Sequence, residues 1–145
     1  MGVEAHGLAN GYRSGLEAKA AAEYRQRGYD APFEKFKLKY TVPATTKTYT
    51  WDFTQLWNGI LVETKGRFVT ADRKKHLYIQ DQFPDLDIRF VFSNSKQKIG
   101  KASPTTYAMW CAKAGFQYAD KSVPEAWLKE PPCPRRMAAL KALMP

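Results

Sequence analysis

The chain has 145 residues, of which 44% are hydrophobic and 14% aromatic, so it should form one domain with a buried core, which excludes a disordered chain. Its 23 Lys and Arg against 14 Asp and Glu give a formal charge of +9, which favours a polyanionic partner, with nucleic acid ahead of an anionic membrane surface. We find no secretory signal, no apolar run that could span a bilayer and no paired cysteine motif, which argues against a secreted, transmembrane or zinc-binding protein.

The first predicted elements are an arm, a helix and a strand. Residues 1–13 are rich in glycine and follow no helical or strand period, so we expect a flexible N-terminal arm there. A helix is predicted from Ser14 to Arg27, because Ser14 and Glu17 fit a capping box. Aromatic and aliphatic residues alternate with lysines within 33–40, which predicts a half-exposed strand.

A hairpin and a second helix come next. Asn58-Gly59 is a strong two-residue turn signal, and it separates predicted strands at 49–54 and 60–65. A helix is then expected over 70–82, with Thr70 as its cap and a proline shortly after its end.

The remaining pattern completes an α/β domain. We predict a strand at 87–93, a helix between Pro104 and Gly115, a strand within 116–120 and a short tail helix in 135–144. The main elements follow the order α-β-β-β-α-β-α-β, and a helix between the third and fourth strands permits a parallel crossover. The predicted fold is therefore a mixed sheet flanked by helices. Cys111 and Cys133 are expected to be reduced thiols.

The predicted hairpin carries charged residues that a hairpin does not need. With a two-residue turn, Thr54 pairs with Glu63 and Asp52 with Lys65, and since side chains alternate between faces, the two acids and the lysine project from one face. Neighbouring carboxylates repel unless a proton or a metal lies between them. Oxygen donors alone suit Mg²⁺ or Mn²⁺, and a nearby ammonium can stabilise phosphoryl charge, so the set is typical of a phosphodiesterase centre.

A simpler interpretation of the same residues stays open. Asp52 and Lys65 would form a cross-strand ion pair, with Glu63 solvated, and such surface pairs contribute about 0–1 kcal/mol. The spacing does not decide between the two, whereas the basic charge and the strand context favour chemistry.

Several segments together resemble the phage endonuclease I family, Holliday-junction-resolving enzymes of the PD-(D/E)xK nuclease superfamily. The resemblance runs from about Tyr12 to Pro131, and Trp51 stands where the superfamily name has proline. The matching segments, in chain order, are YRSGLEAK (12–19), YTWDF (49–53), NGILVETKG (58–66), DRKKHL (72–77), DLDIRFVFS (85–93), SPTTY (103–107) and FQYADKSVPEAWLKEP (116–131).

The resemblance implies a Mg²⁺-dependent endodeoxyribonuclease that cleaves four-way junctions and other branched DNA, with Mn²⁺ as a substitute metal. It implies that Asp52, Glu63 and Glu17 bind metal and that Lys65 is the catalytic lysine. Members of this family have a restriction-endonuclease-like fold and form intertwined, domain-swapped homodimers, in which each site combines the first-helix acid of one subunit with the other three residues from its partner. From the residues alone, Glu17 is only a capping residue.

The resemblance also sets the expected domain limits and location. We expect a nuclease domain over 14–131 and a C-terminal tail over 132–145. The expected location is the cytoplasm of a phage-infected host cell.

Two basic stretches are candidate DNA contacts, although charge runs are often only solvated. Since such contacts would be with phosphates, we expect DNA binding to depend strongly on salt. The sequence does not decide whether His76 contacts DNA or packs a helix against the rest of the fold. The candidate contacts are Arg67, Arg73, Lys74 and Lys75 after the hairpin, and Lys96 and Lys98 in a later loop.

Two other functions stay open at this point. One is a basic nucleic-acid-binding protein without catalysis, in which the acids merely pair with lysines. The other is a nuclease of the same fold that cuts plain or mismatched duplex.

Overall fold

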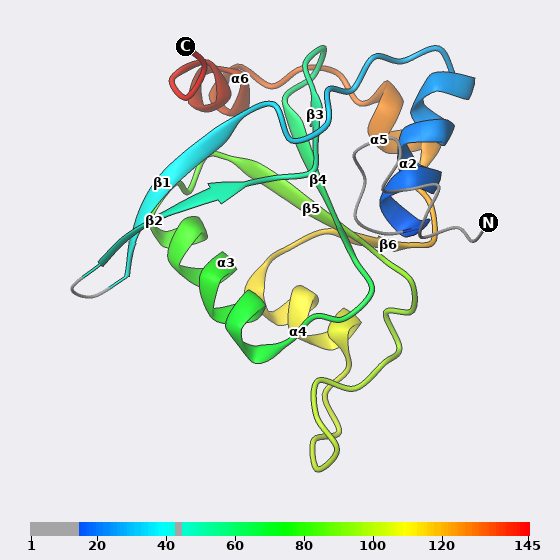
Figure 1. Cartoon of the computed structure of the whole chain (residues 1–145), viewed down its shortest axis with the longest axis vertical. Helices are drawn as coiled ribbons and strands as arrows, with labels where there is room; N and C mark the ends of the chain where they lie inside the picture. The colour runs from blue at the N-terminus through cyan, green and yellow to red at the C-terminus, as the bar shows by residue number, and fades with distance from the viewer. Residues whose placement is uncertain (1–14, 43–44) are drawn as a thin grey trace.

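Two sheets organise the chain in the computed structural model, which describes residues 15–42 and 45–145 (Figure 1). A two-stranded antiparallel sheet pairs β1 (Lys37–Val42) with β2 (Thr45–Thr50). The main sheet has the order β3-β4-β5-β6, formed by β3 (Phe53–Gln55), β4 (Ile60–Lys65), β5 (Asp87–Phe92) and β6 (Tyr118–Asp120). β3 is antiparallel to β4, whereas β4, β5 and β6 run parallel, so the predicted mixed sheet is confirmed.

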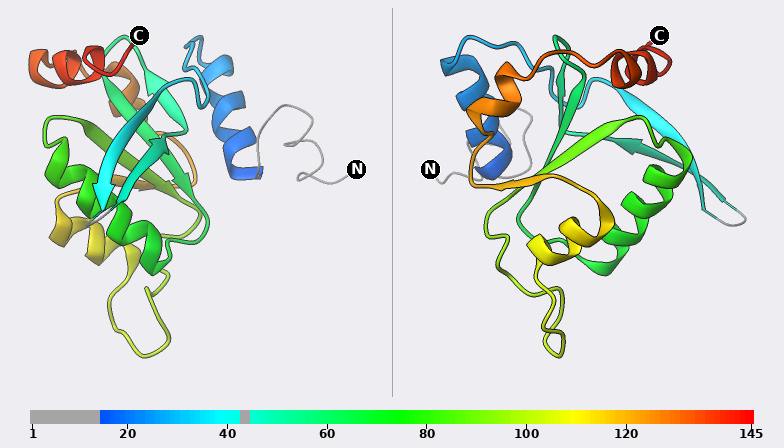
Figure 2. Two further views of the ribbon diagram at one scale, coloured as in Figure 1. Left: turned by 60° about the vertical axis from the view of Figure 1, so that its left-hand side comes forward. Right: turned by 180° about the vertical axis from the view of Figure 1, so that it is seen from behind.

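Helices cover both faces of the main sheet (Figures 1 and 2). Ile79 and Cys111, from α3 and α4, join one apolar cluster with Leu61 of β4. Tyr24 and Trp127, from α2 and α5, join a second cluster on the other face. The helices are α2 (Gly15–Gln26), α3 (Thr70–Gln82), α4 (Tyr107–Ala114), α5 (Glu125–Lys129) and α6 (Pro134–Lys141).

The predicted order of elements is wrong at one point, because the strand expected over 49–54 is two strands. The chain leaves the small sheet after β2, bends at Trp51 and Asp52, and enters the main sheet as β3. The Trp51 indole donates a hydrogen bond to the Thr54 hydroxyl at 2.6 Å, which stabilises the bend. In the sequence, aromatic residues alternate with polar residues from Tyr49 to Thr54, so the pattern carries no sign of the change of sheet.

The predicted two-residue turn at Asn58-Gly59 is also wrong, because four residues, 56–59, connect β3 to β4. The side-chain amide of Asn58 contacts a distant segment of the chain. It donates hydrogen bonds to the backbone carbonyls of Trp127 and Glu130, at 2.9 Å each. The backbone carbonyl of Asn58 accepts from Arg136 Nε at 2.7 Å. These tertiary contacts hold a wider turn than the dipeptide signal predicts.

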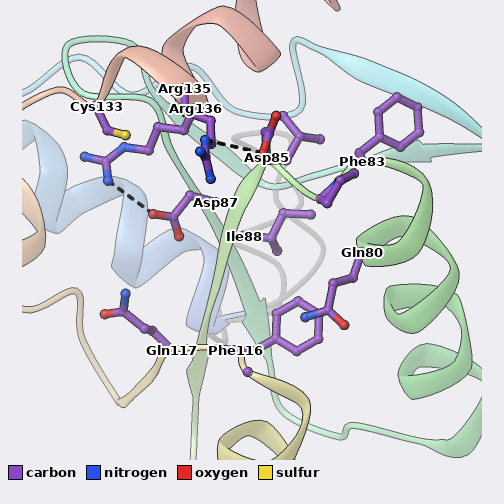
Figure 3. A pocket seen from close by; sticks show the side chains of 13 residues that line it. Gln80, Phe83, Asp85, Asp87, Ile88, Phe116, Gln117, Cys133, Arg135 and Arg136 are labelled. Atoms are coloured by element: carbon purple, nitrogen blue, oxygen red, sulfur yellow. Dashed lines mark hydrogen bonds and ion pairs between the residues drawn. The ribbon is translucent and has the colours of Figure 1, made fainter.

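The tail helix is fixed to the body by charged groups. Arg89, almost fully buried, pairs with Asp87 and Glu130, and Arg136 donates to Glu130 at 2.7 Å. Figure 3 shows the ion pair of Arg136 with Asp87 and a second pair between Arg135 and Asp85. These four residues line a hollow of about 280 Å³. The hollow contains none of the acids of the hairpin.

The helix ends and the state of the cysteines agree with the prediction from the sequence, with one exception. α4 lies between Pro104 and Gly115, as predicted, and the Thr106 hydroxyl accepts from the Met109 N–H and so caps it. Val69 and not Thr70 precedes α3, without a side-chain cap. Cys111 and Cys133 are free thiols. None of the described helices is long and apolar enough to cross a bilayer.

Some predicted features lie outside the described residues. These are the arm over 1–13 and the cap at Ser14.

Candidate active site

Asp52 and Glu63 meet where β3 joins β4. Asp52 directly precedes β3 and is 3% exposed, and Glu63 lies in β4 and is 4% exposed. One oxygen of Asp52, Oδ2, accepts hydrogen bonds from the backbone N–H and the hydroxyl of Thr64, both at 2.9 Å. The acid that precedes the strand is thereby held against the strand that carries the second acid.

The observed register differs from the predicted one by two residues. Phe53 pairs with Val62 and Thr54 with Leu61, so one further step of the ladder sets Asp52 opposite Glu63. A shift of two leaves the side chains of β3 and β4 on their predicted faces, because the strand period is two. Trp51, which precedes the bend, packs instead in the apolar cluster of Leu61, whereas Phe53 packs in the cluster of Val62. The acids are therefore closer than the diagonal arrangement expected from the sequence.

The electrostatics of this pair favour a cation. Burial, and then the neighbouring Glu63 carboxylate, raises the pKa of Asp52 from 3.8 to about 8. Two buried carboxylates without a positive partner between them are unstable as a pair of charges. A divalent cation with oxygen ligands relieves this repulsion, so the donor set fits Mg²⁺ or Mn²⁺.

Glu63 is held from the side of α3 and the small sheet. The Tyr49 hydroxyl donates to Glu63 Oε2 at 2.6 Å, and His76 Nε2 lies 3.7 Å from the same oxygen. His76 is fully buried, and burial, followed by the nearby Lys75, lowers its pKa to about 3. His76 is therefore a neutral, helix-packing residue, which settles the two alternatives that the sequence leaves open for it.

Two lysines complete the charged set. Lys65 Nζ lies 3.5 Å from Asp72 Oδ1 on α3, so the ion pair with Asp52 considered in the sequence is not among the ion pairs of the described residues. Lys75 Nζ lies 5.0 Å from the centroid of the Tyr49 ring. Burial and the charge of Lys65 lower the pKa of Lys75, which indicates that both ammonium groups face one site.

Comparison with known proteins decides the family. The family model described as phage endonuclease I matches residues 2–144. The chain belongs to the phage endonuclease I family. It is 50% identical over 120 residues to "Endonuclease I" of Escherichia phage T7, which covers 83% of this chain and 80% of that protein. It is 48% identical over 120 residues to "Endodeoxyribonuclease 1" of Enterobacteria phage T3, covering 83% and 78%.

In this member of the phage endonuclease I family, Glu17 stands apart from the other two acids. It is buried in the first turn of α2, and α2 packs on the sheet face opposite to the one toward which Glu63 points. Within 15–42 and 45–145, no group of three or more His, Cys, Asp or Glu side chains is placed to hold a metal. The described residues thus bring Asp52 and Glu63 together without Glu17.

The candidate DNA contacts differ in exposure. Arg73 is buried, and its guanidinium donates to the Phe68 carbonyl and the Thr70 hydroxyl, so its contacts stabilise the start of α3. Lys75 is half-buried beside the acids. Four other candidates are exposed: Arg67, Lys74, Lys96 and Lys98.

Three residues of the site are not predicted from the sequence: Tyr49, Thr64 and Asp72. Asp72 carried a signal, as the one acid among the basic residues after the hairpin. Thr64 carried none, because its hydroxyl contact depends on the bend before β3. Tyr49 was expected only as a strand residue, since a contact between two sheets leaves no periodic pattern.

Proposed function

We propose that the protein is a Mg²⁺-dependent endodeoxyribonuclease that cleaves four-way junctions and other branched DNA, with Mn²⁺ as a substitute metal. The observation that carries this proposal is the pair of buried carboxylates, Asp52 and Glu63, on the hairpin that ends in Lys65. Membership of the phage endonuclease I family supports the nuclease class.

Each residue of the hairpin has a distinct task in this proposal. Asp52 and Glu63 hold the cation, and Thr64 fixes Asp52 through two hydrogen bonds. A bound divalent cation neutralises phosphoryl charge and makes water easier to deprotonate. Lys65 orients the scissile phosphate and stabilises the charge that develops on its oxygens, while Asp72 keeps the lysine in place. The products are a 5′-phosphate and a 3′-hydroxyl.

Glu17 enters through a homodimer in this proposal. Each site would join Glu17 from the first helix of one subunit to the hairpin residues of the other. The separation of Glu17 from the two assembled acids in the described chain supports a composite site, as does the placement of α2 on the opposite sheet face.

The basic surface would bind the DNA arms. Exposed side chains, above all Arg67, Lys74, Lys96 and Lys98, would contact phosphates, and Lys75 would contact the phosphate nearest to the acids. Arg73 is left out because its guanidinium is engaged within the fold. Such contacts recognise shape and charge more than base sequence.

The test is cleavage of a synthetic four-way junction and of a matched duplex, each with Mg²⁺ and with EDTA. We expect EDTA-sensitive cleavage of the junction in preference to the duplex. Asp52→Asn and Glu63→Gln should reduce cleavage by more than about 100-fold, because even outer-shell partners of a metal contribute 10–100-fold. Junction binding should persist in both variants.

Three other outcomes would contradict the proposal. Binding without cleavage would indicate a non-catalytic DNA-binding protein. Equal cleavage of junction and duplex would indicate a general nuclease. Cleavage that survives EDTA or the Asp52→Asn substitution would remove the proposed role of the acids.

A further inference from the structure

Tyr49 connects the small sheet to an acid of the main sheet. It lies near the end of β2, whose ladder partner among the described strands is β1 and not the strand that carries Glu63. Its side chain is 2% exposed, and its hydroxyl donates to Glu63 Oε2 at 2.6 Å. The contact therefore joins two sheets through side chains alone.

A donor on one carboxylate oxygen fixes the orientation of the whole group. The hydroxyl engages Oε2, and His76 Nε2, at 3.7 Å from that oxygen, is beyond good hydrogen-bonding distance. Neither ring nitrogen of His76 has a hydrogen-bond partner among the described residues, so the imidazole does not replace the tyrosine. Tyr49 thus restricts the rotation of the Glu63 carboxylate and leaves Oε1 for a cation.

We propose that Tyr49 is a positioning residue for the metal site, acting through Glu63. Partners that orient a metal ligand without touching the metal contribute substantially to metal affinity. This inference rests on the proposed function, because it takes Glu63 as a metal ligand. It adds that the small sheet, through Tyr49, presets the carboxylate of the main sheet before a cation arrives.

The ring of Tyr49 has a second, separable contact. Lys75 Nζ lies over the ring, and a cation over an aromatic face is attracted by it. Phenylalanine keeps the ring and removes the hydroxyl, whereas leucine removes both. Tyr49→Phe should therefore affect the cation, and Tyr49→Leu should also affect the placement of Lys75 toward DNA.

The test is calorimetric titration of the full chain with Mn²⁺ in the absence of DNA. Tyr24→Phe is the matched control, because Tyr24 is another buried tyrosine whose hydroxyl donates to a buried side chain, Gln55 Oε1 at 3.0 Å, in the other apolar cluster. We expect Tyr49→Phe to weaken Mn²⁺ binding by about 10- to 100-fold and Tyr24→Phe to leave it unchanged. Both should lower the metal-free melting temperature to a similar extent.

The outcomes separate this inference from the proposed function. Wild-type affinity for Mn²⁺ in Tyr49→Phe would overturn the role of Tyr49 and leave the metal site intact. Equal weakening in both variants would also overturn it, because the effect would then follow stability. Absence of Mn²⁺ binding by the wild type would overturn the proposed function itself.

A second measurement serves if Tyr49→Phe does not fold. Mn²⁺ added to the wild type should perturb the ultraviolet absorption of tyrosine, because the acceptor of the Tyr49 hydroxyl becomes a metal ligand. Glu63→Gln should lack this difference signal. Identical difference spectra for the two proteins would overturn the proposal.

Discussion

At the scale of single residues, Asp52 and Glu63 oppose the stability of the metal-free fold. Both are almost fully buried and lie opposite each other, and the ion pair of Lys65 is formed with Asp72 and with neither of these acids. A divalent cation bound between them, as proposed, would relieve this repulsion.

This arrangement predicts an unusual pH dependence of stability. Asp52 keeps its proton in the folded, metal-free state up to about pH 8, whereas the unfolded chain releases it near pH 3.8. Between these values the folded state binds more protons, so the free energy of unfolding should fall as the pH rises. Thermal unfolding in EDTA should show a melting temperature that is lower at pH 8 than at pH 5.

Two controls check the cause of this effect. Asp52→Asn should remove most of the decrease, and Mg²⁺ should reverse it in the wild type at pH 8. A melting temperature that is flat or rises over this range in EDTA would show that Asp52 is ionised in the fold.

Asp72 offers a second prediction at this scale. Its carboxylate is the described partner of Lys65, so Asp72→Asn should free the ammonium to move. Misplacement of a catalytic group by about 1 Å can cost up to about 100-fold in rate, so we expect junction cleavage to fall by about 10- to 100-fold. Metal affinity should change little.

Asp81→Asn is the control for this prediction, since Asp81 is an exposed acid on the same helix. A rate for Asp72→Asn equal to that of Asp81→Asn would show that Lys65 needs no counter-ion.

At the scale of elements, alternation along the strands predicted the candidate site. The period of two predicted that Asp52, Glu63 and Lys65 share one face, and the observed register, which is shifted by two residues, sets Asp52 opposite Glu63. The helix behind the hairpin permits a parallel crossover, and β4 does pair in parallel with β5. Both inferences use only local sequence.

The inferences that failed depend on distant segments. Asn58 forms no two-residue turn because carbonyls about 70 residues further along the chain accept from its amide. The bend at Trp51, which divides one predicted strand into two, depends on two sheets that meet there. Hydrophobic period reports the face of a strand, but not which sheet that strand joins.

The turn between β3 and β4 yields a prediction about glycine. Gly59 has φ of +84°, and a Cβ there would lie 2.8 Å from Met137 Sδ and 3.1 Å from Arg136 Cγ. The thioether can move away, whereas the Arg136 guanidinium is tied to Asn58 and Glu130. Gly59→Ala should therefore reduce the free energy of unfolding by about 1–3 kcal/mol more than backbone strain alone.

Gly28→Ala is the control that measures backbone strain without a steric clash. Gly28 has φ of +79° and nothing within 4 Å of an added Cβ, so alanine there should cost only about 1–2 kcal/mol. Urea denaturation of the two variants gives the difference. An equal decrease in the free energy of unfolding for the two variants would show that α6 moves away from the added methyl group without loss of stability.

At the scale of the whole molecule, the position of Glu17 predicts complementation between inactive chains. Glu17→Ala and Asp52→Ala should each be inactive as homodimers. Co-expression should form heterodimers in which one site is intact, so cleavage should return to on the order of a quarter of the wild-type rate. If heterodimers form but the mixture does not cleave, each active site must take Glu17 from the same chain as its Asp52, Glu63 and Lys65.

The central claim is that Asp52 and Glu63 together hold a divalent cation. Its most direct test is anomalous diffraction from crystals of the protein soaked in Mn²⁺. We expect an anomalous peak within about 2.5 Å of a carboxylate oxygen of each residue. An ordered hairpin with no peak there, at an Mn²⁺ concentration that supports cleavage in solution, would contradict it.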